Sequence, residues 1–506
     1  MHQILLAVLA CGLLAFLCRP DRRRLPPGPA RKVLLGNIYN VPRQPEEWKG
    51  FAALGKLYGP VSYLRVLGRD VVILNSAKAV NDLLEQRSAI YSNRPRFVMA
   101  NEVAGFDWLI PFMPYGNFLR QHRRALHQHL NEAAAKTWWN TQQDLNVRFL
   151  KKLIDAPGDW WDLTHWLAGA NIMRMTFGIE IAKKDDPWID LGIKVAEVAS
   201  KAGSFGAFAV DIFPLLKYIP AWFPGAKFKR DAIEWRQVHV QAKNLPFQRV
   251  VKDMAAGNAM SCIARSMLEE DTKDSSLSEE VMKNALGAIY LGGADTSLAA
   301  MRGFVFAMVL NPSAQKTAQD EIDRTLSDGT LPSHPDRPHL PYVEALYRET
   351  MRMYPIAPLT PHCVTEEDEY EGMTIPKGST VIANTWGILH DEETYPEPET
   401  FKPERFLKQG ALDPDVLDPR NPAFGYGRRV CPGRHIADAE LWLFIVTMLS
   451  CYNISPAEDG NGEPIIPPST MCSGLVSSVS KFPCNIQLRN ESKRKLILAE
   501  ADRLKL

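Results

Sequence analysis

A glycine-punctuated loop that presents one cysteine constrains this chain most. Residues 424–433 read Phe-Gly-Tyr-Gly-Arg-Arg-Val-Cys-Pro-Gly, and a long apolar run follows them. The glycines permit backbone conformations that a side chain would block, and Pro432 stands where a helix would begin. We predict that Cys431 lies at a helix N-terminus, where its thiol pKa falls and the metal-binding thiolate is favoured. Three arginines lie beside it in the sequence: Arg428, Arg429 and Arg434. Because a lone cysteine in a turn is more often a small buried apolar residue, Cys431 alone leaves both interpretations open.

The complete pattern Phe-x-x-Gly-x-Arg-x-Cys-x-Gly resembles the haem-binding signature of the cytochrome P-450 family. It matches at Phe424, Gly427, Arg429, Cys431 and Gly433. The resemblance implies a heme b cofactor whose iron is axially ligated by the Cys431 thiolate, with Phe424, Arg429 and Gly433 as cofactor-binding residues. Thiolate ligation gives haem iron electron density that favours O–O cleavage. It also implies the family's fold, mainly α with a small β-rich lobe (α+β), with haem between a long oxygen-binding helix and the cysteine-loop helix.

Composition agrees with a large globular enzyme. The 506 residues are 46% hydrophobic and 23% charged, which is ample material for one large core. A formal net charge of +1 argues against nucleic acid as a partner. The eight cysteines are scattered without zinc-like spacing or a disulfide framework, and sparse cysteine in a chain of this size is typical of a reducing compartment.

The first residues predict a membrane anchor. Residues 4–18 are apolar and uncharged, and four arginines and a Pro-Pro-Gly-Pro segment follow. A cleaved secretory signal would carry its positive charge before the apolar run rather than after it, and positive charge stays cytosolic. We therefore expect an anchor at 1–18, a stiff basic and proline-rich hinge at 19–45 and a catalytic domain at 46–506. The expected location is the endoplasmic reticulum membrane, single-pass, with the catalytic domain cytosolic.

The longest helix candidate spans residues 277–310, begins near Ser278 and contains Leu-Gly-Gly-Ala-Asp-Thr-Ser at 291–297. Two glycines inside a helix cost roughly 1 kcal/mol each relative to alanine, so they need an explanation. One is a helix break, with Asp295 or Thr296 capping the next helix. The other is a kink that opens space for dioxygen, and the run matches the family's oxygen-helix pattern. The resemblance then implies catalytic roles for Thr296, as hydrogen-bond donor to bound oxygen, and Asp295, as proton relay.

A second motif pair implies a structural triad. Glu349 and Arg352 are spaced to share one helix face, and Pro-Glu-Arg-Phe follows at 403–406. In isolation, Glu349 and Arg352 would most simply be a surface ion pair of little value. In the family, the matching residues Glu349, Arg352 and Arg405 form a buried network behind the cysteine loop.

Two basic residues are candidates for the haem propionates. Residues 117–130 are predicted to form a helix with a basic face, which is usually a solvated face. Within it Arg123 matches the family's propionate-binding arginine, whereas Leu119 stands where the family carries a tryptophan. His362 matches the other propionate position, and a satisfied core histidine is its alternative. Residues 205–224 are rich in aromatics and proline and serve equally well as a pocket lid near the membrane or as core.

The resulting prediction is a membrane-anchored haem-thiolate monooxygenase of fungal secondary metabolism. It would oxidise a lipophilic small molecule with O2 and with electrons from an NADPH-cytochrome reductase, a b-type cytochrome being a second candidate donor. No flavin or nicotinamide fingerprint with its own domain occurs in the chain. A haem-thiolate isomerase or dehydratase and a non-catalytic haem-binding protein remain as alternatives. A secreted form would expose the sequons beginning at Asn453 and Asn490 to glycosylation.

Overall fold

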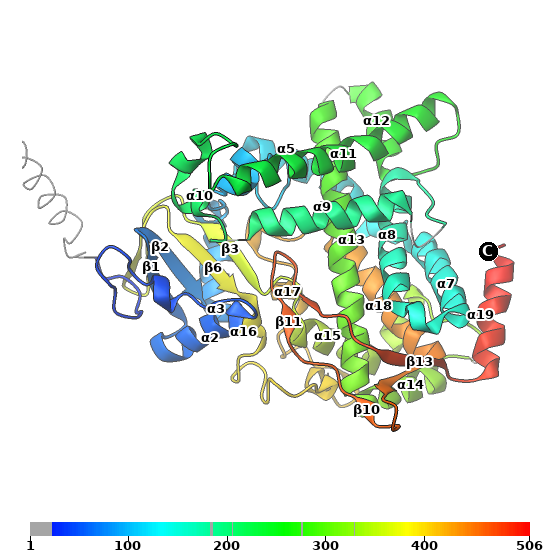
Figure 1. Cartoon of the computed structure of the whole chain (residues 1–506). Coiled ribbons are helices and arrows are strands. Elements are labelled where there is room, and N and C mark those ends of the chain that lie inside the picture. Colours follow the sequence, from blue (N-terminus) through cyan, green and yellow to red (C-terminus); the bar gives the residue numbers. More distant parts are fainter. Residues whose placement is uncertain (1–22, 183–185, 205, 275–276, 328, 506) are drawn as a thin grey trace, which may run out of the picture. The chain divides into compact units, whose positions relative to one another are not determined.

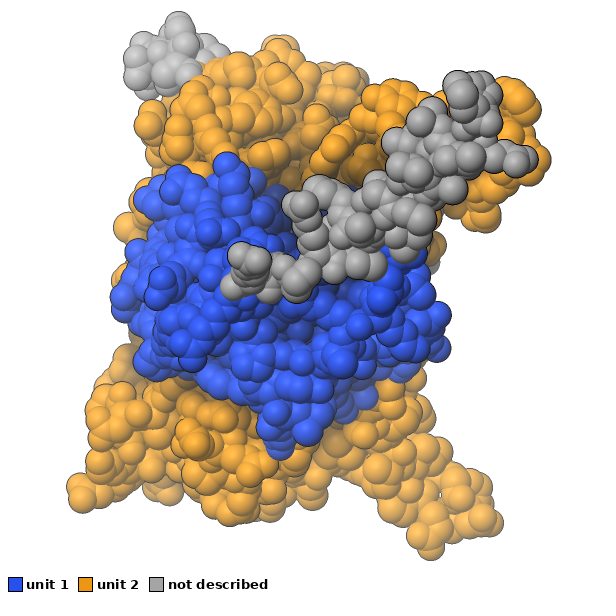
Figure 2. Space-filling model, turned by 90° about the vertical axis from the view of Figure 1, so that its left-hand side faces the viewer, with its two compact units in different colours: residues 1–95, 358–388, 425–429 blue, residues 96–357, 389–424, 430–506 orange. Residues whose placement is uncertain are grey.

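The computed structural model describes residues 23–182, 186–204, 206–274, 277–327 and 329–505. The predicted anchor at 1–18 and the first part of the hinge lie outside these residues. Among the described residues the chain divides into two units, coloured separately in Figure 2. The first unit contains the residues up to Pro95 together with 358–388 and 425–429, and the second contains the rest.

A mixed sheet organises the first unit. Its strands are β1 (Val61–Val66), β2 (Arg69–Leu74), β6 (Thr380–Asn384) and β3 (Leu359–Cys363), in the order β1-β2-β6-β3. Strands β1 and β2 pair antiparallel as a hairpin around Gly68, whose φ is +83°. Strand β6 runs parallel to β2, and β3 returns antiparallel to β6. The unit's other elements are η1 (Ile38–Asn40), α2 (Glu47–Tyr58), α3 (Ala77–Val80), the π-helix η2 (Asn81–Gln86), α4 (Ser88–Tyr91), β4 (Asp368–Tyr370), β5 (Met373–Ile375) and η8 (Gly427–Arg429).

The second unit is helical, and α13 (Glu279–Leu310) runs through it (Figure 1). Its other long helices are α5 (Asn117–Leu130), α7 (Trp139–Asp155), α8 (Trp160–Phe177), α9 (Pro187–Gly203), α11 (Lys227–Ala255), α12 (Ile263–Asp274), α14 (Pro312–Thr325), α15 (Pro341–Met353), α18 (Arg434–Cys451) and α19 (Glu491–Arg503). Short elements are η3 (Val98–Val103), α6 (Glu132–Lys136), η4 (Pro157–Asp159), α10 (Ala209–Ile212), η5 (Pro214–Tyr218), η6 (His334–His339), η7 (Pro403–Phe406) and α17 (Arg420–Ala423). Its strands are β7 (Leu407–Lys408), β8 (Ala411–Leu412), β9 (Tyr452–Glu458), β10 (Pro464–Ile465), β11 (Met471–Cys472), β12 (Ser478–Val479) and β13 (Cys484–Leu488), while α16 (Thr385–Leu389) spans a unit boundary.

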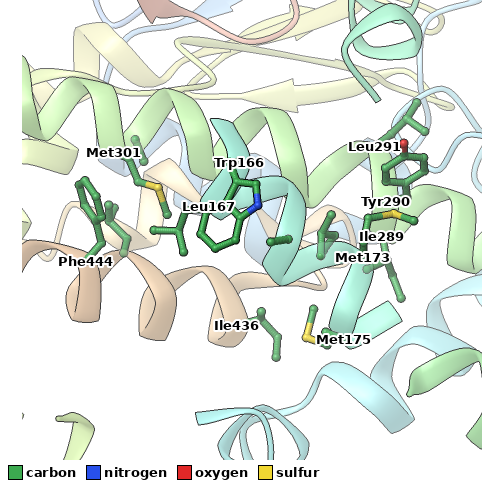
Figure 3. Close-up of a cluster of buried hydrophobic side chains, with 14 of the residues drawn as sticks. Trp166, Leu167, Met173, Met175, Ile289, Tyr290, Leu291, Met301, Ile436 and Phe444 are labelled. Atoms are coloured by element: carbon green, nitrogen blue, oxygen red, sulfur yellow. The ribbon is translucent and has the colours of Figure 1, made fainter. Parts of the chain in front are cut away.

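The core of the second unit forms where α8, α13 and α18 meet. Figure 3 shows Trp166 and Leu167 from α8 lying near Met301 from α13 and Phe444 from α18. All four of these side chains are buried. Burial of this apolar surface is the main stabilising contribution to such a core. The predicted mainly helical architecture with small sheets is therefore confirmed.

Candidate active site

The cysteine loop is held by its own backbone. The Cys431 N–H donates to the Phe424 carbonyl at 2.7 Å, which closes the loop on itself. Gly427 adopts φ +52°, and a Cβ there would lie 2.2 Å from the Leu84 carbonyl oxygen, so only glycine fits. Helix α18 begins at Arg434 with Gly433 as its N-cap residue, so Pro432 precedes the helix rather than opening it, which corrects the prediction.

The electrostatics of Cys431 also differ from the prediction. Burial raises the pKa of its thiol, whereas a backbone hydrogen bond from Gly433 and the charges of Arg123 and Arg434 lower it. Burial is the largest of these causes, so the protein alone does not favour the thiolate. Metal coordination deprotonates a thiol outright. With a metal bound, the surrounding cations and N–H group would stabilise the charge on sulfur.

Arg123, on helix α5, lies close enough to Cys431 for their charges to interact. Among the described residues, the Arg123 guanidinium has no hydrogen-bond or ion-pair partner. Burial lowers its pKa. A buried cation without a partner is costly, so the position calls for an anion. Leu119, where the family carries a tryptophan, is fully buried core instead. Arg123 therefore fits a haem propionate without help from an indole.

The first unit holds the other two predicted cofactor residues. His362 Nδ1 donates to the Tyr91 carbonyl at 3.0 Å, and Arg429 Nε donates to the Ser92 carbonyl at 2.7 Å. Burial, together with Arg94 and Arg429, holds the pKa of His362 well below its usual value. Its buried Nε2 has no partner among the described residues. His362 is thus neither an exposed group nor a satisfied core histidine. Because Nδ1 carries the proton donated to Tyr91, Nε2 of the neutral ring is an acceptor. An anion would bind at Nε2 only with the ring protonated, and a nearby negative charge would itself favour that form.

Helix α13 is continuous through the glycine pair, so the predicted alternative of a helix break is wrong. A Cβ at Gly293 would lie 2.3 Å from Cδ1 of Ile172, so this glycine lets α8 pack against α13. Gly292 faces open space, and its carbonyl accepts the Thr296 hydroxyl at 2.5 Å. Burial raises the pKa of the neighbouring Asp295 carboxyl, while Arg302 lowers it.

A buried carboxyl beside this site was not predicted. Glu440 on α18 accepts the Ser297 hydroxyl at 2.9 Å, one residue beyond Thr296. Burial raises the pKa of Glu440 to about 7, while hydrogen bonding to Ser297 and Asn171 opposes the shift. The sequence feature that could have pointed to Glu440 is its position as an isolated carboxylate inside the apolar run that follows the cysteine loop.

The predicted triad is assembled, with Glu349 and Arg352 fully buried and Arg405 partly exposed. Glu349 accepts from Arg352 Nε at 2.7 Å and Nη2 at 2.9 Å, and from Arg405 Nε at 3.2 Å. Glu349 and Arg352 are 0% exposed, so the alternative of a surface ion pair is wrong. The remaining guanidinium donors reach backbone carbonyls, among them Leu389 and Thr400. A network so fully hydrogen-bonded fixes the local architecture.

A second ion-pair network, also missed from the sequence, ties the two ends of the cysteine loop together. Arg420 on α17 donates to Asp438 on α18 at 3.0 Å, and Arg337 pairs with both Asp438 and Glu344. These partners hold the pKa of Asp438 at about 2 despite burial. The Phe424 N–H donates to the Arg420 carbonyl at 3.0 Å, which links the network to the residue that bonds Cys431.

The aromatic segments divide between core and surface. Phe97, Phe106 and Phe112 are buried around a π-helical turn, η3. Between α9 and α11, five large side chains are exposed instead: Phe213, Leu215, Tyr218, Trp222 and Phe223. The C-terminal loop reaches the segment after α15, where the Ser477 N–H donates to the Ile356 carbonyl at 2.7 Å.

Comparison with known proteins identifies the family. The family model for cytochrome P-450 matches residues 26–481. Cytochrome P-450 monooxygenase COX2 of Coprinopsis cinerea is 36% identical over 97% of this chain and 95% of its own length. Cytochrome P-450 monooxygenase 98 of Postia placenta is 37% identical over 94% of this chain and 93% of its own. Tryptamine 4-monooxygenase of Psilocybe cyanescens is 36% identical over 96% and 97%, respectively. The family implies a haem-thiolate cofactor, which the donors around Cys431 fit, and the chain belongs to the cytochrome P-450 family as a monooxygenase.

Proposed function

We propose that this chain is a membrane-anchored monooxygenase that inserts one oxygen atom of O2 into a lipophilic secondary metabolite. The observation that carries the proposal is the setting of Cys431, which lies near the guanidinium of Arg123, a cation without a partner among the described residues. Heme b bound through Cys431 would supply the activation of dioxygen. Arg123 and His362 would bind its propionates.

The chain's own residues on α13 would control proton transfer. Burial keeps the Asp295 carboxyl protonated to higher pH than usual, so it can hold and release a proton inside the protein. The Thr296 hydroxyl lies one residue away, at the open space beside Gly292. A proton from Asp295 would pass by way of Thr296 Oγ1 into that space. An isomerase or dehydratase does not need this pair.

The substrate would be apolar. The segment 97–113, which would cover the substrate pocket, has buried aromatic and methionine side chains rather than buried charges. Packing against such surfaces selects by shape and apolar area. The relatives are fungal monooxygenases, and one of them is named for tryptamine. For this chain we propose a lipophilic terpenoid-, steroid- or polyketide-like molecule.

We also propose attachment to the endoplasmic reticulum by residues 1–18, with the catalytic part cytosolic. Among the described helices only α13 is long and apolar enough to cross a membrane, and 67% of its apolar window is buried in the protein. The exposed aromatic segment 213–223 would rest on the membrane surface, where Trp and Tyr side chains are favoured. Asn490 caps α19 by accepting the Lys493 N–H at 3.0 Å, and glycan attachment to its amide would disturb this cap. Glycans found on native protein at Asn453 or Asn490 would contradict the topology.

A monooxygenase of this family needs an electron-donating reductase. Arg120 and Arg124 on α5 are exposed and lie on the same helix as Arg123. We propose that they attract the acidic surface of an NADPH-dependent reductase, with a b-type cytochrome as a second donor. Raising the ionic strength should then slow reduction, because exposed charges are screened by salt.

The test is to co-express the chain with a reductase and screen lipophilic metabolites for products heavier by one oxygen atom. The reduced protein with carbon monoxide should show the strongly red-shifted Soret band of thiolate ligation, and Cys431→Ser should abolish it. Cys472→Ser, at an exposed cysteine remote in sequence, is the matched control. Turnover without NADPH or O2 would refute the proposal, as would a red-shifted band that survives in Cys431→Ser.

A further inference from the structure

The described part of the hinge does not stand free as a spacer but is hydrogen-bonded to strands β1 and β5 of the first unit (Figure 1). The Thr374 N–H donates to the Arg24 carbonyl at 2.7 Å, and the Tyr63 N–H donates to the Pro27 carbonyl at 2.8 Å. Asn37 Nδ2 donates to the Pro29 carbonyl at 2.9 Å. A Cβ at Gly28 would lie 1.9 Å from the Tyr63 carbonyl oxygen, so only glycine permits this close approach. The basic segment is therefore held in a fixed position.

This segment walls a cavity of about 400 Å³ in the first unit. The Arg31 guanidinium lies over the Tyr63 ring, 4.8 Å from its centroid, and two further arginines complete the basic wall. No acidic side chain is among the described residues that line it: Arg23, Arg24, Leu25, Pro26, Gly28, Pro29, Arg31 and Tyr63. The carboxylate of Glu367, outside the lining, pairs with Arg23 at 3.5 Å. Three arginines line this cavity, and such a lining suits a phosphate group, which arginine binds through paired N–H donors.

An apolar turn directly follows the cavity in the chain. Lys32 and Gly36 form a backbone bridge, and the residues between them turn outward. Val33 and Leu34 are 66% and 60% exposed, so the turn presents two adjacent apolar side chains to solvent. A basic site beside an exposed apolar turn is the composition of a segment that lies at a membrane interface, with charges at the headgroups and apolar groups among the acyl chains.

We propose that this cavity binds the phosphate of an anionic phospholipid headgroup while the Val33–Leu34 turn enters the acyl layer. The proposal rests on the membrane attachment argued above, which would bring the cavity to the bilayer. The chemistry recognised is a phosphate, and the apolar turn is what favours a lipid over free phosphate. Binding would fix how the first unit meets the membrane, beyond what a flexible tether could do.

The test uses the full chain in uncharged detergent, titrated calorimetrically with short-chain phosphatidic acid, short-chain phosphatidylcholine or inorganic phosphate. Phosphatidic acid should bind saturably and more tightly than the other two. The double variant Arg24→Gln/Arg31→Gln should weaken it about 25-fold, at about fivefold for each basic residue removed near a lipid surface. Arg43→Gln/Lys377→Gln changes charge equally at exposed positions of the same unit and should shift affinity less than about twofold.

A second variant distinguishes the two sources of phosphate. Leu34 has φ +65°, a conformation that asparagine tolerates, so Leu34→Asn removes the apolar side chain without straining the turn. This variant should bind phosphatidic acid more weakly and bind inorganic phosphate with unchanged affinity. Equal affinities for phosphatidic acid and phosphatidylcholine, or for phosphatidic acid and inorganic phosphate, would overturn the proposal. So would an unchanged affinity in Arg24→Gln/Arg31→Gln. A normal carbon monoxide spectrum and product formation in the same preparation would show that the monooxygenase proposal stands even if the headgroup site fails.

Discussion

Replacing Glu440 by glutamine should stabilise the protein, and more so as the pH rises. Burial raises the pKa of Glu440 from 4.5 to about 7, so the unfolded chain releases this proton at lower pH than the folded one. Stability is therefore lost as pH rises through this interval, because the unfolded state binds fewer protons there. By the linkage relation, the raised pKa of Glu440 lowers the free energy of unfolding by about 3 kcal/mol at pH 8 and by about 1 kcal/mol at pH 5. Glutamine removes the titration while keeping an oxygen for the Ser297 hydroxyl, and its amide can donate to Asn171 Oδ1, which has no partner among the described residues.

The assay is the thermal midpoint of haem-loaded wild type and Glu440→Gln, compared at pH 5 and pH 8. An unfolding entropy of about 1 kcal/mol/K for a chain of this length converts the expected gain into about 3 °C at pH 8 and about 1 °C at pH 5. Glu458→Gln, at an exposed position of β9, should leave the midpoint unchanged at both pH values. If the gain is the same at both pH values, or if Glu440→Gln is less stable at pH 8, the carboxyl does not carry a raised pKa and the reasoning fails.

Three further predictions concern Thr296, Glu349 and His239. Thr296→Ala should uncouple NADPH oxidation from product formation. The control is Thr317→Ala at an exposed position of α14, which removes the same kind of hydroxyl bond to the carbonyl four residues back and should leave coupling unchanged. Full coupling in Thr296→Ala would remove Thr296 from the mechanism. Glu349→Ala should lower the free energy of unfolding by about 3–5 kcal/mol, because it leaves buried Arg352 without its carboxylate. Thermal unfolding, followed together with the carbon monoxide spectrum, measures this loss. A loss as small as that of a surface ion pair would contradict the buried network. Burial lowers the pKa of His239 to about 4, so the folded state favours the neutral ring and stability should fall as pH drops below 6.5, by about 2 kcal/mol at pH 5 for this residue. His239→Gln should flatten the acid side of the midpoint–pH curve, and an unchanged slope would refute this assignment.

The sequence predicted those parts of the site that depend on local spacing. The loop around Cys431, the helix beginning after Ser278 and the pairing of Glu349 with Arg352 each follow from residues a few positions apart. A hairpin around Gly68 was also predictable, because β-prone runs on both sides leave the glycine as the turn. Resemblance to the family added long-range partners such as Arg405, which spacing alone could not supply.

What the sequence could not predict depends on neighbours from distant segments. The two adjacent glycines in α13 serve different purposes, since Gly293 meets Ile172 of α8 while Gly292 meets open space. Likewise the pKa of Cys431 is a balance between nearby cations, visible in the sequence, and burial, which only packing determines. Because desolvation wins that balance, the arginines are better understood as stabilising a thiolate once the metal has formed it than as creating the thiolate beforehand. This order predicts that haem-free protein alkylates slowly at Cys431 at neutral pH, and rapid alkylation there, relative to exposed Cys472 in the same sample, would show that the cations prevail.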